Sequence, residues 1–159
     1  MTFRFIGFAP RLIAGIVFAV LLCATDAARA DGVVFTASGH AIRGFDPVAY
    51  FTEGKAVEGK DDFVHDWSGV TWRFASAANR DRFAAAPDSY APQYGGYCAW
   101  AVSKGYTAPT DPDAWKIVAG KLYLNYSKGV QSQWVAAGPE KLIALGDPNW
   151  PAIKADLKN

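Results

Sequence analysis

Sulfur and imidazole side chains are scarce in this sequence of 159 residues. It contains two cysteines, two histidines and one methionine, Met1. Because a soft-metal site needs several converging thiolate, thioether or imidazole ligands, this composition excludes a copper carrier of the methionine-cluster type. The sequence also lacks a Cys-x-x-Cys pair and a glycine-rich phosphate loop that ends in Gly-Lys-Ser or Gly-Lys-Thr.

A large excess of one charge is also missing, since 16 Lys and Arg residues stand against 15 Asp and Glu residues. Leaving out residues 1–30 removes Arg4, Arg11 and Arg29 from the bases and Asp26 from the acids. The remainder has 13 bases and 14 acids, a net charge of about −1. Proteins that bind nucleic acids or anionic membranes present basic surfaces, so we expect neither partner.

The first 30 residues have the pattern of an export signal. Positive charge at Arg4 and Arg11 precedes an uncharged apolar run, Leu12 to Ala24, which is short for a membrane span. Ala28-Arg29-Ala30 then has the small-x-small pattern of a cleavage site. We predict a cleaved signal peptide over residues 1–30, and a mature protein in the periplasm or outside the cell without stable membrane insertion.

The predicted mature chain keeps one cysteine. Cys23 lies in the signal, whereas Cys98 lies in the run Tyr94-Gly95-Gly96-Tyr97-Cys98-Ala99-Trp100. An unpaired cysteine in an exported protein is a reactive thiol, one half of an intermolecular disulfide, or a buried inert group. A helix that begins after Gly96 would favour the thiolate through its first-turn N–H groups, and the aromatic side chains would wall a pocket. The residues alone favour a buried, inert Cys98 over a reactive thiol.

Local patterns predict a small α+β fold in a single domain. Val33 to Thr36 is expected to form a short strand. Alternating aromatic and β-branched residues on either side of Ser68-Gly69 and of Ala119-Gly120 indicate two β-hairpins. Serine and proline positions delimit several short helices, including one from Ser76 to Pro87 and two at the C-terminal end. The two hairpins are expected to pack against these helices, with Trp72, Phe74 and Phe83 in the core.

Two stretches resemble the YHS domain family. They are Gly44-Phe45-Asp46-Pro47-Val48-Ala49-Tyr50-Phe51 and the segment from Trp72 to Tyr90, with Phe83, Pro87 and Asp88 in the family's spacing. With the cysteine run and Leu122 to Tyr126, the chain is similar to exported bacterial YHS domain-containing (seleno)proteins. The resemblance implies a YHS-like domain over residues 31–159. Selenocysteine in some members, at the position that matches Cys98, implies redox use of that position. With this resemblance, we predict that Cys98 is a partly accessible thiol with a lowered pKa at a helix start.

This sequence differs from the metal-binding members of that family at one position where they have a cysteine. Metal-binding YHS modules have a cysteine shortly after the Asp-Pro pair, where this chain has Ala49 and Tyr50. We therefore assign no metal ligand and no cofactor, while a site that combines Cys98 with His40 or His65 stays open.

Three functions follow, and whether the protein is an enzyme is open. The first is a thiol-redox protein with Cys98 as the catalytic residue, ligand-binding residues at Tyr94, Gly95, Gly96, Tyr97 and Trp100, and a small-molecule thiol or another protein as partner. The second is a module that handles transition metals. The third is a non-catalytic module that binds a small ligand in an aromatic pocket near Cys98.

Overall fold

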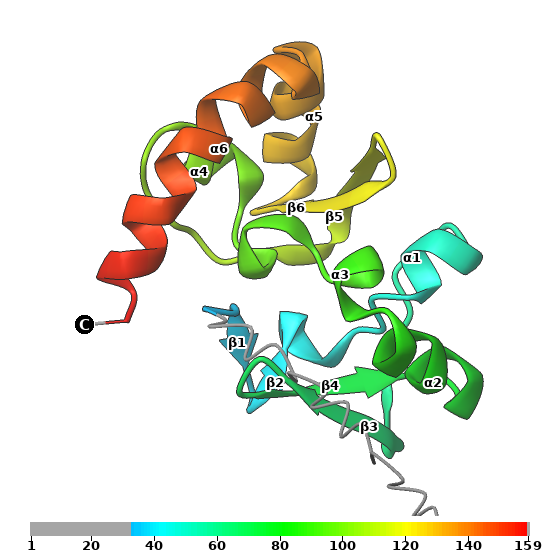
Figure 1. Ribbon diagram of the computed structural model, residues 1–159. Coiled ribbons are helices and arrows are strands. Elements are labelled where there is room, and N and C mark those ends of the chain that lie inside the picture. The colour runs from blue at the N-terminus through cyan, green and yellow to red at the C-terminus, as the bar shows by residue number, and fades with distance from the viewer. Residues whose placement is uncertain (1–32, 159) are drawn as a thin grey trace, which may run out of the picture.

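The first predicted hairpin belongs to a four-stranded sheet in the N-terminal half of the chain (Figure 1). The structure is a computed structural model that describes residues 33–158. The strand order is β1-β2-β4-β3, with β2 and β4 parallel and the other neighbours antiparallel. The strands are β1 Thr36–Ala37, β2 His40–Ala41, β3 Lys60–Trp67 and β4 Val70–Phe74. Val33 to Phe35 precede β1, so the strand predicted over 33–36 is wrong except at Thr36.

The second predicted hairpin is confirmed in the C-terminal half. It consists of β5 Asp111–Val118 and β6 Lys121–Asn125, which pair antiparallel. The turn residues Ala119 and Gly120 both have positive φ, 48° and 75°, as do Ser68 and Gly69 of the first hairpin, 60° and 77°. Positive φ at both central residues is the type I′ geometry, whose twist matches that of the paired strands.

Short helices fill the space around both hairpins, as predicted. The helices are α1 Ala49–Thr52, α2 Ala77–Ala85, α3 Pro87–Tyr90, α4 Ala99–Ser103, α5 Lys128–Ala136 and α6 Pro139–Asp156, with 3-10 turns η1 Ile42–Gly44 and η2 Gln93–Gly96. Two of these helices, α2 and α5, begin after a capping serine. Ser76 Oγ accepts the Asn79 N–H at 3.2 Å, and Ser127 Oγ accepts the Val130 N–H at 3.3 Å.

Strand β6 separates two groups of buried side chains. Leu122 and Leu124 face the N-terminal core, whereas Tyr123 between them faces the C-terminal core, because successive side chains of a strand point to opposite sides. The N-terminal core contains Trp72, Phe74 and Phe83 as predicted, with Ala41, Ile42, Val48, Tyr50, Leu122 and Leu124. The C-terminal core contains Tyr94, Ala99, Val102, Tyr123, Trp134, Leu142 and Ile153. This shared strand makes the two halves one α+β domain.

A buried carboxylate joins the elements of the N-terminal half. Asp46 is fully buried. Its Oδ1 accepts the N–H groups of Val48 (2.8 Å) and Ala49 (3.3 Å) at the start of α1. Its Oδ2 accepts the Ala75 N–H (2.9 Å) and the Asn79 side-chain amide (2.7 Å), at the junction of β4 and α2. Asp46 therefore satisfies N–H groups at the start of α1 and also ties that helix to the hairpin.

The predicted signal peptide, residues 1–30, lies outside the described residues. Within residues 33–158, none of the helices combines the length and the apolar character that a membrane span requires.

Candidate functional site

Cys98 occupies the N-cap position of α4, so the expected helix start is present. Its side chain, however, is only 1% exposed. The backbone N–H of Tyr126 donates to Sγ at 3.3 Å, and the thiol lies 3.8 Å from Oδ1 of buried Asn125, which also accepts the Trp100 N–H at 3.3 Å. The thiol is enclosed between α4 and β6, where Cys98 forms a parallel bridge with Leu124.

The expectation of a partly accessible thiol with a lowered pKa is therefore wrong for the native conformation. Burial raises the pKa of Cys98, and the opposing effect of the backbone N–H groups of Ala101, Tyr126 and Trp100 is smaller. Removal of water disfavours the thiolate directly, and the summed dipole of a helix of only five residues is small.

We expect iodoacetamide to leave Cys98 unlabelled in the native protein near neutral pH and to label it in urea. The thiolate is the reacting form, so both burial and the raised pKa slow the reaction, and its midpoint should lie above the ordinary value of about 8.5. Mass spectrometry of intact protein lacking residues 1–30 measures the labelling, with Cys98→Ala as the blank. Native labelling as fast as that of the unfolded chain would contradict the buried position.

The five residues predicted to bind a ligand around Cys98 do not form one pocket. Tyr94 and Gly95 line a cavity. Gly96 lies against the Ile42 side chain: a Cβ added to Gly96 would come within 2.6 Å of Ile42 Cγ2. Tyr97 packs edge-on against Phe35, with ring centroids 5.6 Å apart. Trp100 lies beneath the ammonium group of Lys104, at 5.1 Å.

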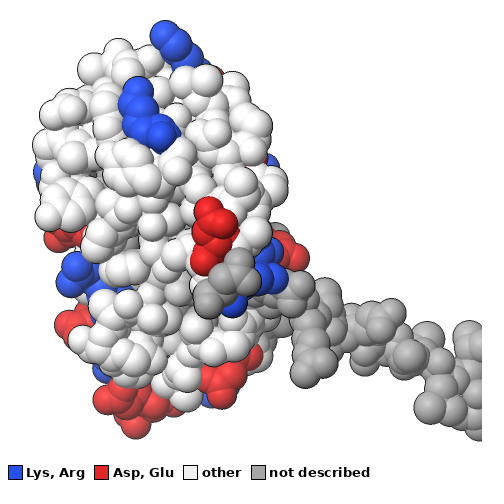
Figure 2. All heavy atoms as spheres, turned by 90° about the vertical axis from the view of Figure 1, so that its left-hand side faces the viewer, with Lys and Arg blue, Asp and Glu red and all other residues white. Residues whose placement is uncertain are grey.

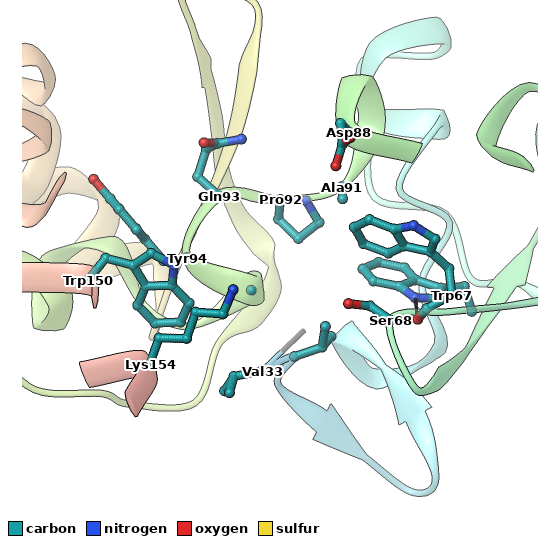
Figure 3. A pocket seen from close by; sticks show the side chains of 13 residues that line it. Val33, Trp67, Ser68, Asp88, Ala91, Pro92, Gln93, Tyr94, Trp150 and Lys154 are labelled. Carbon is teal, nitrogen blue, oxygen red and sulfur yellow. Dashed lines mark hydrogen bonds between the residues drawn. The ribbon is translucent and has the colours of Figure 1, made fainter. Parts of the chain in front are cut away.

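The cavity that Tyr94 and Gly95 line measures about 220 Å³ and lies between the two halves of the molecule (Figure 3). We call it the interhalf cavity. Its lining comes from the β3–β4 hairpin, α3, η2, α6 and the residues before β1. These residues are Val33, Val34, Trp67, Ser68, Trp72, Asp88, Ala91, Pro92, Gln93, Tyr94, Gly95, Trp150 and Lys154.

The wall on the N-terminal side consists of two tryptophans. Trp72 Nε1 donates to the Trp67 carbonyl at 3.1 Å, and the two ring centroids are 5.8 Å apart. Phe83 packs against both rings, at 5.6 Å from Trp67 and 5.0 Å from Trp72. Contact with the fully buried Phe83 holds the indoles in place, so this wall is preformed.

The opposite wall consists of Tyr94 and Trp150, whose ring centroids are 5.8 Å apart. The Tyr94 hydroxyl donates to Asp147 Oδ1 at 2.8 Å. Burial, with a further contribution from this bond, raises the pKa of Tyr94, so the hydroxyl keeps its proton over the physiological range. A Cβ on Gly146 would come within 2.8 Å of the Tyr94 hydroxyl oxygen, so α6 approaches the tyrosine closely only because this position is a glycine.

A left-handed turn forms the part of the interhalf cavity between these walls. Tyr94, Gly95 and Gly96 have φ values of 54°, 58° and 81°. A Cβ on Gly95 would lie 2.0 Å from the Val33 carbonyl oxygen, and the Gly95 carbonyl accepts the Phe35 N–H at 2.9 Å. Gly95 is thus required by its positive φ and by the close approach of the Val33 backbone, and Gly96 by its positive φ and by its contact with the Ile42 side chain.

Two opposite charges line the interhalf cavity. Asp88 comes from α3 and Lys154 from α6, one turn after Trp150. In the part of the chain that the structure describes, neither side chain forms a hydrogen bond or an ion pair, whereas Lys55–Glu53, Arg73–Asp61 and Arg80–Asp81 are paired. In Figure 2, most of the surface over the C-terminal half is uncharged, and acidic side chains gather at the end where the N-terminal sheet lies.

The two histidines have local partners. His40 Nδ1 lies 3.0 Å from the Ser38 carbonyl oxygen, and the His65 ring packs on Phe83 at 6.2 Å. Among residues 33–158, no group of three or more His, Cys, Asp or Glu residues has an arrangement that could hold a metal ion.

A scan against protein-family models found no match, and searches of curated proteins and of solved structures found none either. The resemblance to YHS domains therefore stays a prediction.

Sequence reasoning did not identify most of the cavity lining. It predicts Trp72 as a core residue and does not single out Asp88, Trp150 or Lys154 as site residues. The one available signal was the spacing of four between Trp150 and Lys154, which puts both on one face of a helix.

Proposed function

We propose that the protein is an exported, non-catalytic module that binds a small ligand in the interhalf cavity. The observation that carries the proposal is the combination of aromatic walls with two charged side chains that have no partner among the described residues. Ligand sites are typically concave and mostly apolar, with a few polar groups that set orientation. This is the third of the three functions predicted from the sequence, with a pocket that Tyr94 and Gly95 line but Cys98 does not.

Rigidity of the walls supports binding rather than catalysis. Trp67 and Trp72 rest on Phe83, and Tyr94 is held by Asp147, so little side-chain entropy is lost when a ligand enters. The potential nucleophile Cys98 does not line the interhalf cavity.

A screen of small amines, carboxylic acids and amino acids tests the proposal. Binding is followed by the NMR signals of the six tryptophan indole N–H groups, three of which, those of Trp67, Trp72 and Trp150, lie at the cavity. We expect compounds that bind to shift these three signals. Trp150→Ala should weaken binding about tenfold or more through loss of one wall.

Trp100→Ala is the matched control, because Trp100 is also partly buried but does not line the cavity. It should leave binding unchanged. If no compound binds, or if Trp100→Ala weakens binding as much as Trp150→Ala does, the proposed site is wrong.

Thiol-redox chemistry at Cys98 is the second candidate, and one observation favours it. The buried Nδ2 of Asn125 has no hydrogen-bond partner among the described residues, although Oδ1 of the same amide lies beside Sγ. Attack of the thiolate on one peroxide oxygen would break the O–O bond, release the other oxygen as water or an alcohol, and leave a sulfenic acid whose oxygen lies beside this amide. Addition of one oxygen to native protein under peroxide, lost in Cys98→Ala, would favour this candidate.

The module that handles transition metals is the remaining alternative from the sequence. Metal analysis of the purified protein tests it, with bound metal lost in Cys98→Ala as the result that would favour it.

A further inference from the structure

The two charged side chains of the interhalf cavity lie on opposite walls (Figure 3). Asp88 lies on the Trp67 side, above Ala91, whereas Lys154 lies on the Trp150 side. The exposed fraction is larger for Asp88 than for Lys154, which is half-buried. Because the Asp88 carboxylate and the Lys154 ammonium group do not pair with each other, each is free to bind an oppositely charged group of one ligand.

The Trp67 side of the cavity suits a cation. A positively charged group over the face of an indole is attracted by the negative face of the ring, and a nearby carboxylate adds a charge-assisted hydrogen bond. Asp88 together with the partly exposed Trp67 ring supplies both kinds of contact. An anion placed here would face the Asp88 carboxylate.

The Trp150 side suits an anion. Trp150 and Lys154 are four residues apart on α6 and so share a face of the helix. Lys154 presents its ammonium group to the cavity from this wall (Figure 3). A cation placed here would meet the like charge of Lys154.

The volume of about 220 Å³ limits the size of the ligand. It lies below the range of roughly 300–1,000 Å³ that is usual for drug-sized ligands. A molecule of amino-acid size fits better than a nucleotide or an oligosaccharide.

Resting on the proposed binding function, we infer that the ligand is a small zwitterion. Its ammonium group lies between Asp88 and the tryptophan wall, and its carboxylate pairs with Lys154. A ligand with a single charge leaves one of the two charged side chains unpaired and is bound more weakly.

Length-matched probes test this inference. Isothermal titration calorimetry compares ω-amino acids of four, six and eight carbons with the alkylamine and the alkanoate of the same length. We expect at least one ω-amino acid to bind about tenfold or more tightly than both of its singly charged counterparts. The preference should shrink as salt is added, because charge contacts at a partly exposed site are screened.

Variants of Asp88 and Lys154 identify which charged group of the ligand each side chain binds. Asp88→Asn should weaken binding of the amino acid and the amine about tenfold and spare the alkanoate. Lys154→Gln should weaken binding of the amino acid and the alkanoate and spare the amine. Asp62→Asn and Lys141→Gln remove exposed charges away from the cavity and should change none of the affinities.

Two results would overturn the inference while leaving the proposed binding function intact. One is that an amine or an alkanoate binds as tightly as every amino acid of the series. The other is that Asp88→Asn and Lys154→Gln act no differently from Asp62→Asn and Lys141→Gln. Absence of binding by every amine, carboxylic acid and amino acid tested would overturn the binding function as well.

Discussion

Replacing Asp46 by alanine is expected to lower the free energy of unfolding by about 3–5 kcal/mol. The carboxylate is fully buried and accepts four hydrogen bonds, three from backbone N–H groups and one from the Asn79 amide. Alanine leaves these donors in a buried site without an acceptor, and the cost of each unpaired donor exceeds the net gain from an ordinary hydrogen bond. Urea unfolding of the purified variant measures the loss.

Asp111→Ala is the matched control for Asp46→Ala. Asp111 also accepts a backbone N–H, that of Asp113 at 2.9 Å, but at an exposed position. Water replaces that bond, so the control should lose less than about 1 kcal/mol. Equal losses in the two variants would show that the Asp46 network does not stabilise the fold.

Asp46→Asn separates the two halves of the network. An asparagine keeps one oxygen for the donors at α1 but turns an NH₂ group toward the Ala75 N–H and the Asn79 amide, which are donors themselves. This variant should therefore be clearly destabilised although its shape is almost unchanged.

Phe83→Ala is expected to destabilise the protein by about 3–5 kcal/mol, since the ring is fully buried and its loss leaves a cavity. The ring contacts Trp67, Trp72, Phe74 and His65. A decrease in the melting temperature on the order of 10 °C should accompany the loss. Differential scanning calorimetry measures both quantities.

Leu145→Ala serves as the control for Phe83→Ala, because Leu145 is 47% exposed. It should cost less than about 1 kcal/mol. A Phe83→Ala loss as small as this would contradict close packing of the ring. Because Trp67 and Trp72 rest on Phe83, the variant should also weaken ligand binding in the interhalf cavity at a temperature where it is still folded.

Elements that depend on neighbouring residues could be predicted from the sequence. Both hairpins, with turns at Ser68-Gly69 and Ala119-Gly120, are local structures whose turn residues and alternating strands lie within a few positions. The cap at Ser76 and the end of α2 before Pro87 are equally local. Trp72 and Phe74 were placed in the core because residues two apart share a strand face.

The candidate site could be predicted only in part. The run around Gly95 and Gly96 indicated a special backbone, and the structure has a left-handed turn there. The sequence did not show which side of that turn faces a cavity, because this depends on the position of Trp150 and Lys154 on α6 and of Trp67 on β3.

Cys98 shows most clearly the difference between what the sequence determines and what only the tertiary structure decides. The sequence by itself determined that Cys98 is the single cysteine after residue 30, that glycines precede it and that a helix follows, since these are properties of the sequence and of adjacent residues. Only the tertiary structure decided that β6 covers the thiol, with Asn125 and the Tyr126 N–H beside it. Burial by a distant strand removes water and raises the pKa, an effect that local helix-start chemistry does not overcome. In the same way, the pair of opposite charges in the interhalf cavity arises because the packing of the two halves brings α3 and α6 to one space.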